Sequence, residues 1–217
     1  ALDGAGVPCA MLDPKLVGDA ALPLAELEKM PGCRTKEKDQ DIAEAEKLVK
    51  KHHPNGIDIE MSFRQVGNYS DRSQLVAAQL RKIGIRGTLK THESAAGFAA
   101  FGKGDFTLLT SQDRAMDSTD PGDPFSLIWT TQGGSNYGKW SDPKLDELAD
   151  RALKETDRAK RAKMYQDLQR MFLNGAPSAI PVGWVEGWFF VDKKVRGYKH
   201  ASTAYDNITF MKVWLAQ

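Results

Sequence analysis

The sequence predicts an α/β fold in which a largely parallel sheet is flanked by helices. Residues 57–63 alternate between apolar and polar side chains, as a strand with one buried face does, and residues 85–91 and 106–110 are typical of two further strands. Helical periodicity over about residues 70–83 separates the first two strands, and a short helical stretch at 94–101 precedes the third. Strands that alternate with helices in this order form parallel sheets covered by helices.

Further helices are predicted on either side of these strands. A helix before the first strand can be capped by Asp39 or Asp41 and ends at Pro54-Asn55-Gly56. Two consecutive helices lie further along the chain, where Asp142 and Asp157 are placed as their caps. The last part of the chain has strand-like stretches, which are residues 179–185, 188–191 and 209–215.

These patterns divide the chain into three segments. Residues 1–37 are interrupted repeatedly by Gly and Pro and are predicted to form a loop-rich lead-in. Residues 38–179 form the predicted α/β region, and residues 180–217 are rich in predicted strands.

Composition excludes several classes of function. The chain of 217 residues has a formal net charge of +1, so no overall positive field recruits nucleic acid. No stretch approaches the roughly 18 consecutive apolar residues that cross a bilayer, and the first ten residues lack the pattern of a secretory signal. Cys9 and Cys33 are the two cysteines, and both a disulfide and two free thiols remain open.

Motifs for catalysis and cofactors are absent. The sequence contains no GxSxG, no phosphate-binding P-loop, no GxGxxG after a strand and no HExxH. His52 and His53 are adjacent at a helix end, where favourable placement against the helix dipole explains them better than catalysis does. The sequence therefore indicates no cofactor and no metal ion.

An acidic stretch follows the third predicted strand. Asp113, Asp117, Asp120 and Asp123 lie where ligands bind in α/β proteins, beyond the carboxyl end of a strand. Asp123 is better explained as the cap of a short helix at 124–129. Asp120 lacks such a local role and is predicted to be an unpaired carboxylate that receives a ligand ammonium, although a salt bridge to Arg114 is the alternative.

The loop GGSNYGKW, residues 133–140, combines Gly-rich backbone, an amide and two aromatic rings. This composition suits an extended polar ligand, and it suits an ordinary loop before a helix equally well.

The ordered series of Asp120 to Pro124, SNYGKWSDPKLDEL and ETDRAKRAKMYQDLQRMFLNGAPSAIPVGW resembles the C-terminal lobe of extracellular solute-binding proteins of family 5. These are the binding components of peptide and nickel ABC importers. DIAEAEKLVKK, followed by a strand, resembles the helix that opens this lobe. The resemblance covers most of the chain.

The resemblance implies a type II periplasmic binding protein lobe that closes on its ligand by hinge bending. It implies that Asp120 holds the α-ammonium of a peptide and that Asn136 and Tyr137 lie in the ligand-binding loop. Arg114 is a candidate for a ligand carboxylate, and Trp129 completes the candidate ligand-binding residues. The resemblance also implies a periplasmic or extracellular location, with a membrane-associated lipoprotein as one form. Export from the cytoplasm favours a disulfide between Cys9 and Cys33.

Family members are more than twice as long as this chain, so the resemblance implies a C-terminal fragment that lacks most of the first lobe. Residues from about 180 onward resemble the segment that returns toward that lobe. Without it, exposed apolar residues such as Trp184, Trp188 and Phe189 are expected to promote self-association.

The predicted function is capture of a peptide or similar small solute for delivery to the membrane permease of an ABC importer, without catalysis. Two alternatives are an acid-base hydrolase that uses Asp117 and Asp120, and a structural module that binds a protein partner.

Overall fold

The computed structural model of the chain describes residues 6–113, 116, 118–175, 179–184, 190–199 and 208–216. The chain forms two compact units. The first consists of residues Leu24–Asp113 and Tyr137–Lys139. The second consists of the described parts of Leu2–Pro23, Arg114–Asn136 and Trp140–Gln217. Each unit is considered separately below.

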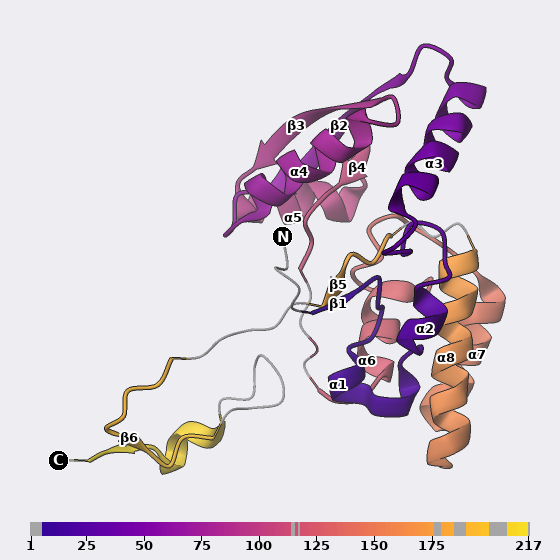
Figure 1. The fold of residues 1–217 in the computed structure, drawn as a ribbon. Coiled ribbons are helices and arrows are strands. Elements are labelled where there is room, and N and C mark those ends of the chain that lie inside the picture. Colours follow the sequence, from indigo (N-terminus) through magenta and orange to yellow (C-terminus); the bar gives the residue numbers. More distant parts are fainter. Residues whose placement is uncertain are drawn as a thin grey trace. The chain divides into compact units, whose positions relative to one another are not determined.

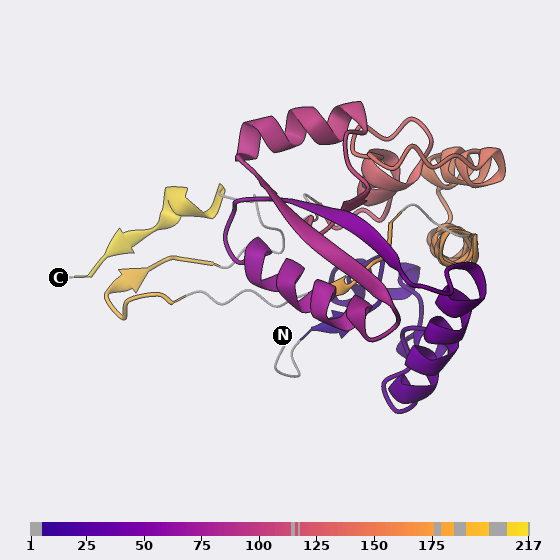
Figure 2. The same cartoon turned by 90° about the horizontal axis from the view of Figure 1, so that it is seen from above.

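The first unit contains a parallel sheet with strand order β3-β2-β4, formed by β2 (Ile57–Arg64), β3 (Ile85–His92) and β4 (Leu108–Leu109). Helices α4 (Tyr69–Arg81) and α5 (Ser94–Lys103) connect these strands, and they cover opposite faces of the sheet (Figures 1 and 2). The predicted α/β fold with a parallel sheet and flanking helices is confirmed. Helix α3 (Lys38–His52) precedes the sheet.

The second unit is built on two long helices, α7 (Pro143–Lys154) and α8 (Arg158–Asn174), which lie side by side (Figure 1). Their predicted caps are confirmed. The Asp142 carboxylate accepts hydrogen bonds from two backbone N–H groups of α7, at 2.9 and 3.3 Å. The Asp157 carboxylate accepts two from α8, both at 3.0 Å. These bonds satisfy N–H groups that have no partner within the helix.

The first residues of the chain are packed more closely than a loop-rich lead-in would be. They contain β1 (Val7–Pro8), α1 (Pro14–Val17), the 3₁₀ turn η1 (Gly18–Ala20) and α2 (Leu24–Leu27). Several of their apolar side chains join the buried cluster of the second unit, alongside those of α7 and α8. The buried members from residues 11–21 are Met11, Leu12, Ala20 and Ala21.

A buried glutamine joins this early segment to α8. Gln169 is only 1% exposed, and its Nε2 donates to the carbonyls of Ala20 at 2.7 Å and Tyr165 at 2.9 Å. Its Oε1 accepts from the backbone N–H of Leu22 at 3.3 Å. The glutamine thus satisfies backbone groups that would otherwise be buried without partners.

Some element boundaries differ from the prediction. Neither Asp39 nor Asp41 caps α3, because both lie inside its first turn and the capping position belongs to Glu37. Asp41 is buried and lies 2.6 Å from the guanidinium of Arg34. The third strand is shorter than the predicted 106–110, because β4 pairs with β2 at only two positions.

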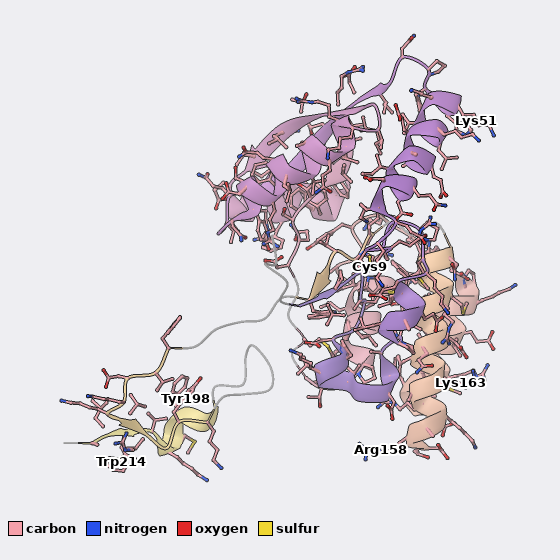
Figure 3. The ribbon with its side chains drawn as sticks, in the orientation of Figure 1. Cys9, Lys51, Arg158, Lys163, Tyr198 and Trp214 are labelled. Carbon is pink, nitrogen blue, oxygen red and sulfur yellow. The ribbon has the colours of Figure 1, made fainter. Side chains whose placement is uncertain are left out.

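The strands near the C-terminus are shorter than predicted. Within the described residues, the predicted strand 179–185 is reduced to β5 (Gly183–Trp184), which is antiparallel to β1. Pro8 of β1 has no backbone N–H, so it donates no hydrogen bond to this pairing. Residues 209–215 lie mostly in the 3₁₀ helix η3 (Ile208–Lys212), because a short apolar run does not fix its own period. Only β7 (Trp214–Leu215) pairs, antiparallel to β6 (Val195–Arg196). Tyr198 lies two residues after β6, and Trp214 lies in β7 (Figure 3).

Cys9 and Cys33, the two cysteines of the chain, are disulfide-bonded. In the part of the chain that the structure describes, no helix has both the length and the apolar character needed to span a membrane.

Replacing Gln169 with leucine tests the buried polar link. We expect Gln169→Leu to lower the free energy of unfolding by about 1–3 kcal/mol, because the Ala20 carbonyl and the Leu22 N–H lose their partner in a buried site. Chemical unfolding followed by tryptophan fluorescence measures this. The control is Gln166→Ala, which removes a bond to the Asp19 carbonyl at the exposed surface of the same helix. Equal effects of the two substitutions would contradict the role given to burial.

Candidate functional site

Asp120, in the acidic loop of the second unit, is paired with an arginine of helix α8. Both carboxylate oxygens of Asp120 accept hydrogen bonds from Nη2 of Arg161, at 2.7 and 2.9 Å. The Oδ1 of Asp120 also accepts from the backbone N–H of Gly122 at 2.8 Å. Arg161 lies in the first turn of α8, and its Nε donates to the Ala152 carbonyl at the end of α7. The prediction that Asp120 is unneutralised by its own chain is therefore wrong.

This ion pair is only partly shielded from solvent. The side chain of Asp120 is 44% exposed and that of Arg161 is 26% exposed. Partial burial acts to raise the pKa of the Asp120 carboxyl, but the hydrogen bonds from Arg161 and Gly122 outweigh it, so the pKa lies below its ordinary value. A ligand ammonium at this carboxylate would compete with an arginine that is already in place.

Other acids and bases of this loop have different positions. Asp123 lies inside α6 (Gly122–Pro124) and does not cap the helical segment, because the capping position belongs to Pro121. Its carboxylate accepts a hydrogen bond from the hydroxyl of Ser118. Arg114 and Asp117, which were predicted to serve a ligand carboxylate and an acid-base reaction respectively, lie outside the described residues.

The side chains of Asn136 and Trp129 make contacts with other residues of the protein. The Nδ2 of Asn136 donates to the carbonyls of Thr130 at 3.2 Å and Trp140 at 2.7 Å, and its Oδ1 accepts from the Trp140 N–H. Trp129 ends the single-turn π-helix η2 (Phe125–Trp129), and its ring packs on Phe125 and Phe172 in the core. The Asn136 amide and the Trp129 ring therefore make contacts within the protein, and their predicted contacts with a ligand stay predictions.

Tyr137 belongs to the first unit, where its ring lies 6.2 Å from that of Phe101. Phe101 is fully buried beneath the sheet and also contacts the ring of His92. Among the predicted site residues, Tyr137 is thus the one that the structure associates with the sheet of the first unit.

The carboxyl ends of β2, β3 and β4 form a second candidate site. Because the three strands are parallel, their last residues meet at one edge of the sheet, which is where ligands bind in open α/β sheets. We call this the carboxyl edge and define it by Arg64 at the end of β2, His92 at the end of β3, and residues 111–113 after β4. Ser111 has a positive φ of 57°, which redirects the chain just beyond β4.

Arg64 is held at this edge by neutral groups. Its Nη1 donates to the hydroxyl of Ser94 at 2.8 Å, and its guanidinium lies 3.9 Å from the ring centre of Phe98. The ring of Tyr69 is 5.6 Å away. Within the described part of the chain, no carboxylate lies at ion-pair distance from Arg64, whereas Arg72 is paired with Asp113 through two bonds of 2.6 Å.

The same edge presents buried donors that lack acceptors. Among the described residues, the Nε atoms of Arg64 and Arg72 and the Nε2 of Gln112 are buried without a hydrogen-bond partner. Tyr69 joins these groups, because Arg72 lies over its ring at 4.9 Å and its hydroxyl accepts from the N–H of Asp113, next to Gln112. Unsatisfied buried donors are uncommon, and a ligand that supplies acceptors would satisfy them.

A chain of hydroxyls lies beneath the edge. Ser62 and Ser73 are fully buried, Ser62 contacts His92 Nε2 at 3.2 Å, and Ser73 contacts the Thr110 hydroxyl at 2.7 Å. Because Ser62 has no access to solvent, its contact with His92 supports the strand ends and offers no exposed nucleophile. No cluster of His, Cys, Asp or Glu side chains able to hold a metal ion is found among the residues that the structure covers.

Sequence reasoning missed Arg64, although a signal was present. Arg64 is the last polar residue of the alternating strand pattern, at the position where a parallel strand meets the ligand side of its sheet. What the sequence does not reveal is that Arg72 and Arg161 are paired with carboxylates, whereas Arg64 has none among the described residues.

The pairing of Asp120 with Arg161 predicts a pH dependence. The pKa of Asp120 is lowered in the folded state, so the pair contributes fully above the ordinary carboxyl pKa and its contribution is lost as pH falls through the lowered value. Because the carboxylate is 44% exposed, we expect the contribution to be about 1 kcal/mol or less.

Unfolding free energies measured from neutral to acidic pH for wild type and Asp120→Asn test this. The difference between the two proteins should shrink as pH falls. Asp123→Asn is the control, since that carboxylate accepts from a serine hydroxyl. A constant difference at all pH values would contradict the ion pair's role.

Comparisons with known proteins give relatives that are named as binding proteins. No family model matches the chain. Heme-binding protein A of Haemophilus influenzae is 28% identical over 169 residues, which are 73% of this chain and 30% of that protein. Di/tripeptide-binding protein 1 of Pseudomonas aeruginosa is 30% identical over 150 residues, which are 63% of this chain and 27% of that protein. The chain thus spans about a third of the length of these relatives or less.

Solved structures agree on the fold. The periplasmic binding protein DppA of Helicobacter pylori, in complex with the peptide STSA, matches with a TM-score of 0.66 and 22% identity over 81% of this chain and 34% of that chain. OppA of Haemophilus influenzae, in complex with RPPGFSPFR, matches with a TM-score of 0.72 and 15% identity over 99% of this chain and 41% of that chain. The predicted periplasmic binding protein fold is confirmed. The chain is similar in sequence to one part of the longer extracellular solute-binding proteins of family 5, and it has their fold.

Proposed function

We propose that the chain is a ligand-binding part of the solute-binding component of an ABC importer, and that its ligand is a peptide bound through a carboxylate. The observation that carries this proposal is Arg64, a guanidinium at the carboxyl edge with buried neighbours and no acidic partner among the described residues.

Physical chemistry favours an anion at this position. A guanidinium in a partly buried site attracts a carboxylate by roughly 4 kcal/mol at 4 Å, for an effective dielectric constant near 20 and before desolvation is counted. Its planar array of N–H donors matches the two oxygens of a carboxylate. The unpartnered Nε2 of Gln112 adds a donor suited to a carbonyl oxygen. A peptide supplies both acceptor types.

The relatives support a peptide ligand and leave one competitor. Two curated relatives are named for di- and tripeptides, and structural neighbours were solved with peptides. Another relative is named for haem, whose propionate groups would present the same carboxylate chemistry to Arg64. The peptide is the better match to the edge, because its backbone carbonyls also satisfy neutral donors.

Binding without catalysis is part of the proposal. The relatives are named as binding proteins. The alternative of an acid-base hydrolase relies on Asp117 and Asp120, and Asp120 is neutralised by Arg161. The proposed location is the periplasm or cell exterior, because structural neighbours are named periplasmic, and the proposed partners are the permease subunits of the importer.

The end of the chain supports the proposal that this sequence belongs with further structure. Several large apolar side chains from residue 180 onward are highly exposed, and a covering segment would remove them from water. The most exposed are Phe190 (97%), Met211 (89%), Ile180 (84%), Val182 (78%) and Leu215 (71%). We propose that further parts of the parent protein cover these side chains and that the isolated chain self-associates through them. Trp184 is half-buried, and Trp188 and Phe189 lie outside the described residues.

Removing the charge of Arg64 tests the carboxylate site. In the complete parent protein, we expect wild type to bind a dipeptide roughly 10–100-fold more tightly than its C-terminal amide, since a hydrogen-bonded charge contributes about 1.5–3 kcal/mol. Arg64→Gln should abolish this preference, and Arg64→Lys should retain part of it. Calorimetry with a dipeptide, its amide and haem distinguishes the ligands. Equal affinities of wild type for acid and amide would refute the proposed site.

A separate experiment tests the ammonium role of Asp120. If Asp120 receives a peptide ammonium despite its pairing with Arg161, Asp120→Asn weakens binding of a free peptide and leaves binding of the N-acetylated peptide unchanged. Calorimetry on the complete parent protein measures both. If both peptides bind Asp120→Asn as they bind wild type while stability falls, Asp120 serves the fold alone.

A further inference from the structure

Helix α5 meets Arg64 with three residues of one face. Ser94, Gly97 and Phe98 have i, i+3, i+4 spacing, so they lie together on the helix surface. Ser94 accepts a hydrogen bond from Nη1 of Arg64, and Phe98 lies 3.9 Å from its guanidinium carbon. The face therefore contacts the guanidinium through both a hydrogen bond and an aromatic ring.

Gly97 determines how closely the helix approaches. A Cβ atom at position 97 would lie 2.7 Å from Cγ and 3.2 Å from Cδ of Arg64, and 3.2 Å from Cβ of His92. These contacts involve the stem of the arginine near the backbone, which cannot swing aside without moving the guanidinium. The absence of a side chain at 97 is thus a steric requirement of the observed Arg64 conformation.

We infer that α5 is a positioning element, in which Ser94, Gly97 and Phe98 hold the Arg64 guanidinium in one orientation before any ligand arrives. The inference rests on the proposed function of Arg64 as a carboxylate-binding residue, and it adds the reason for the strength of that site. A long arginine side chain loses conformational entropy when it is immobilised. A side chain already held in place by its own protein avoids that loss on binding, which raises affinity.

Phe98 gives this arrangement a further property. Its ring is 42% exposed, although it is large and apolar, and one part of it contacts Arg64. The ring orients the guanidinium through a cation–π contact that needs no hydrogen bond. Within the described residues, the Nε of Arg64 is buried and keeps no hydrogen-bond partner, so the ring and the Ser94 hydroxyl orient the guanidinium without neutralising it.

The chain offers a matched pair of glycines for the test. Gly97 and Gly102 both lie in α5, and a Cβ at 102 would meet no atom within 4 Å. Both changes to alanine have the same intrinsic effect on helix propensity. The two variants therefore differ in sterics, because only the Cβ at position 97 would displace Arg64. In the complete parent protein we expect Gly97→Ala to reduce the preference for a dipeptide over its amide about tenfold or more. Gly102→Ala should leave that preference unchanged.

A second readout does not depend on the ligand. The Nε–Hε resonance of Arg64, observed by NMR, should shift or broaden in Gly97→Ala and stay in place in Gly102→Ala. Ser94→Ala, which removes only the hydroxyl acceptor, should produce the same changes more weakly and serves if Gly97→Ala does not fold.

The outcomes separate the two proposals. If wild type shows no preference for the acid, the carboxylate function fails whatever the variants do. If wild type shows the preference, and Gly97→Ala and Ser94→Ala both retain it with an unchanged Arg64 resonance, the positioning role of α5 is overturned while the carboxylate function stands.

Discussion

The parallel arrangement of β2 with β3 and β4 is the constraint on which the candidate site depends. It brings the strand ends to one edge and places Arg64 there, at the end of the central strand. The helices on both faces then supply what surrounds the guanidinium, with Tyr69 from α4 and Ser94 and Phe98 from α5. None of these neighbours is acidic, so the positive charge stays available.

Two arginines with different partners account for the contrast between the predicted and observed sites. Arg161 neutralises Asp120 and joins the acidic loop to α7 and α8, which makes that carboxylate part of the protein's own structure. Among the residues that the structure describes, the partners of Arg64 are a hydroxyl and aromatic rings. Partially buried charges need opposite charges, so Arg64, which has none among the described residues, is a better candidate than Arg161 for meeting a ligand.

Local patterns predicted the fold well where they are strong. The strand predicted from the alternation of 57–63 and the caps Asp142 and Asp157 are confirmed, although Ser62 is buried as well as Met61 and Phe63, so the end of the strand is buried on both faces. The site was harder to predict, because its properties depend on pairings between distant residues. No local signal tells that Asp120 meets Arg161, 41 positions away, or that the Asn136 amide is used within its own loop. The prediction of strands near the C-terminus was wrong for most of their residues, because a short apolar run does not distinguish the periodicity of a strand from that of a helix.

The most direct test of the central claim is a structure of the complete parent protein with its bound solute. The account predicts a carboxylate oxygen of that solute within hydrogen-bond distance of the Arg64 guanidinium, with α5 and Phe98 placed as they are without ligand. A solute bound elsewhere, with Arg64 still lacking an acidic partner or paired with a carboxylate of the protein itself, would contradict the account.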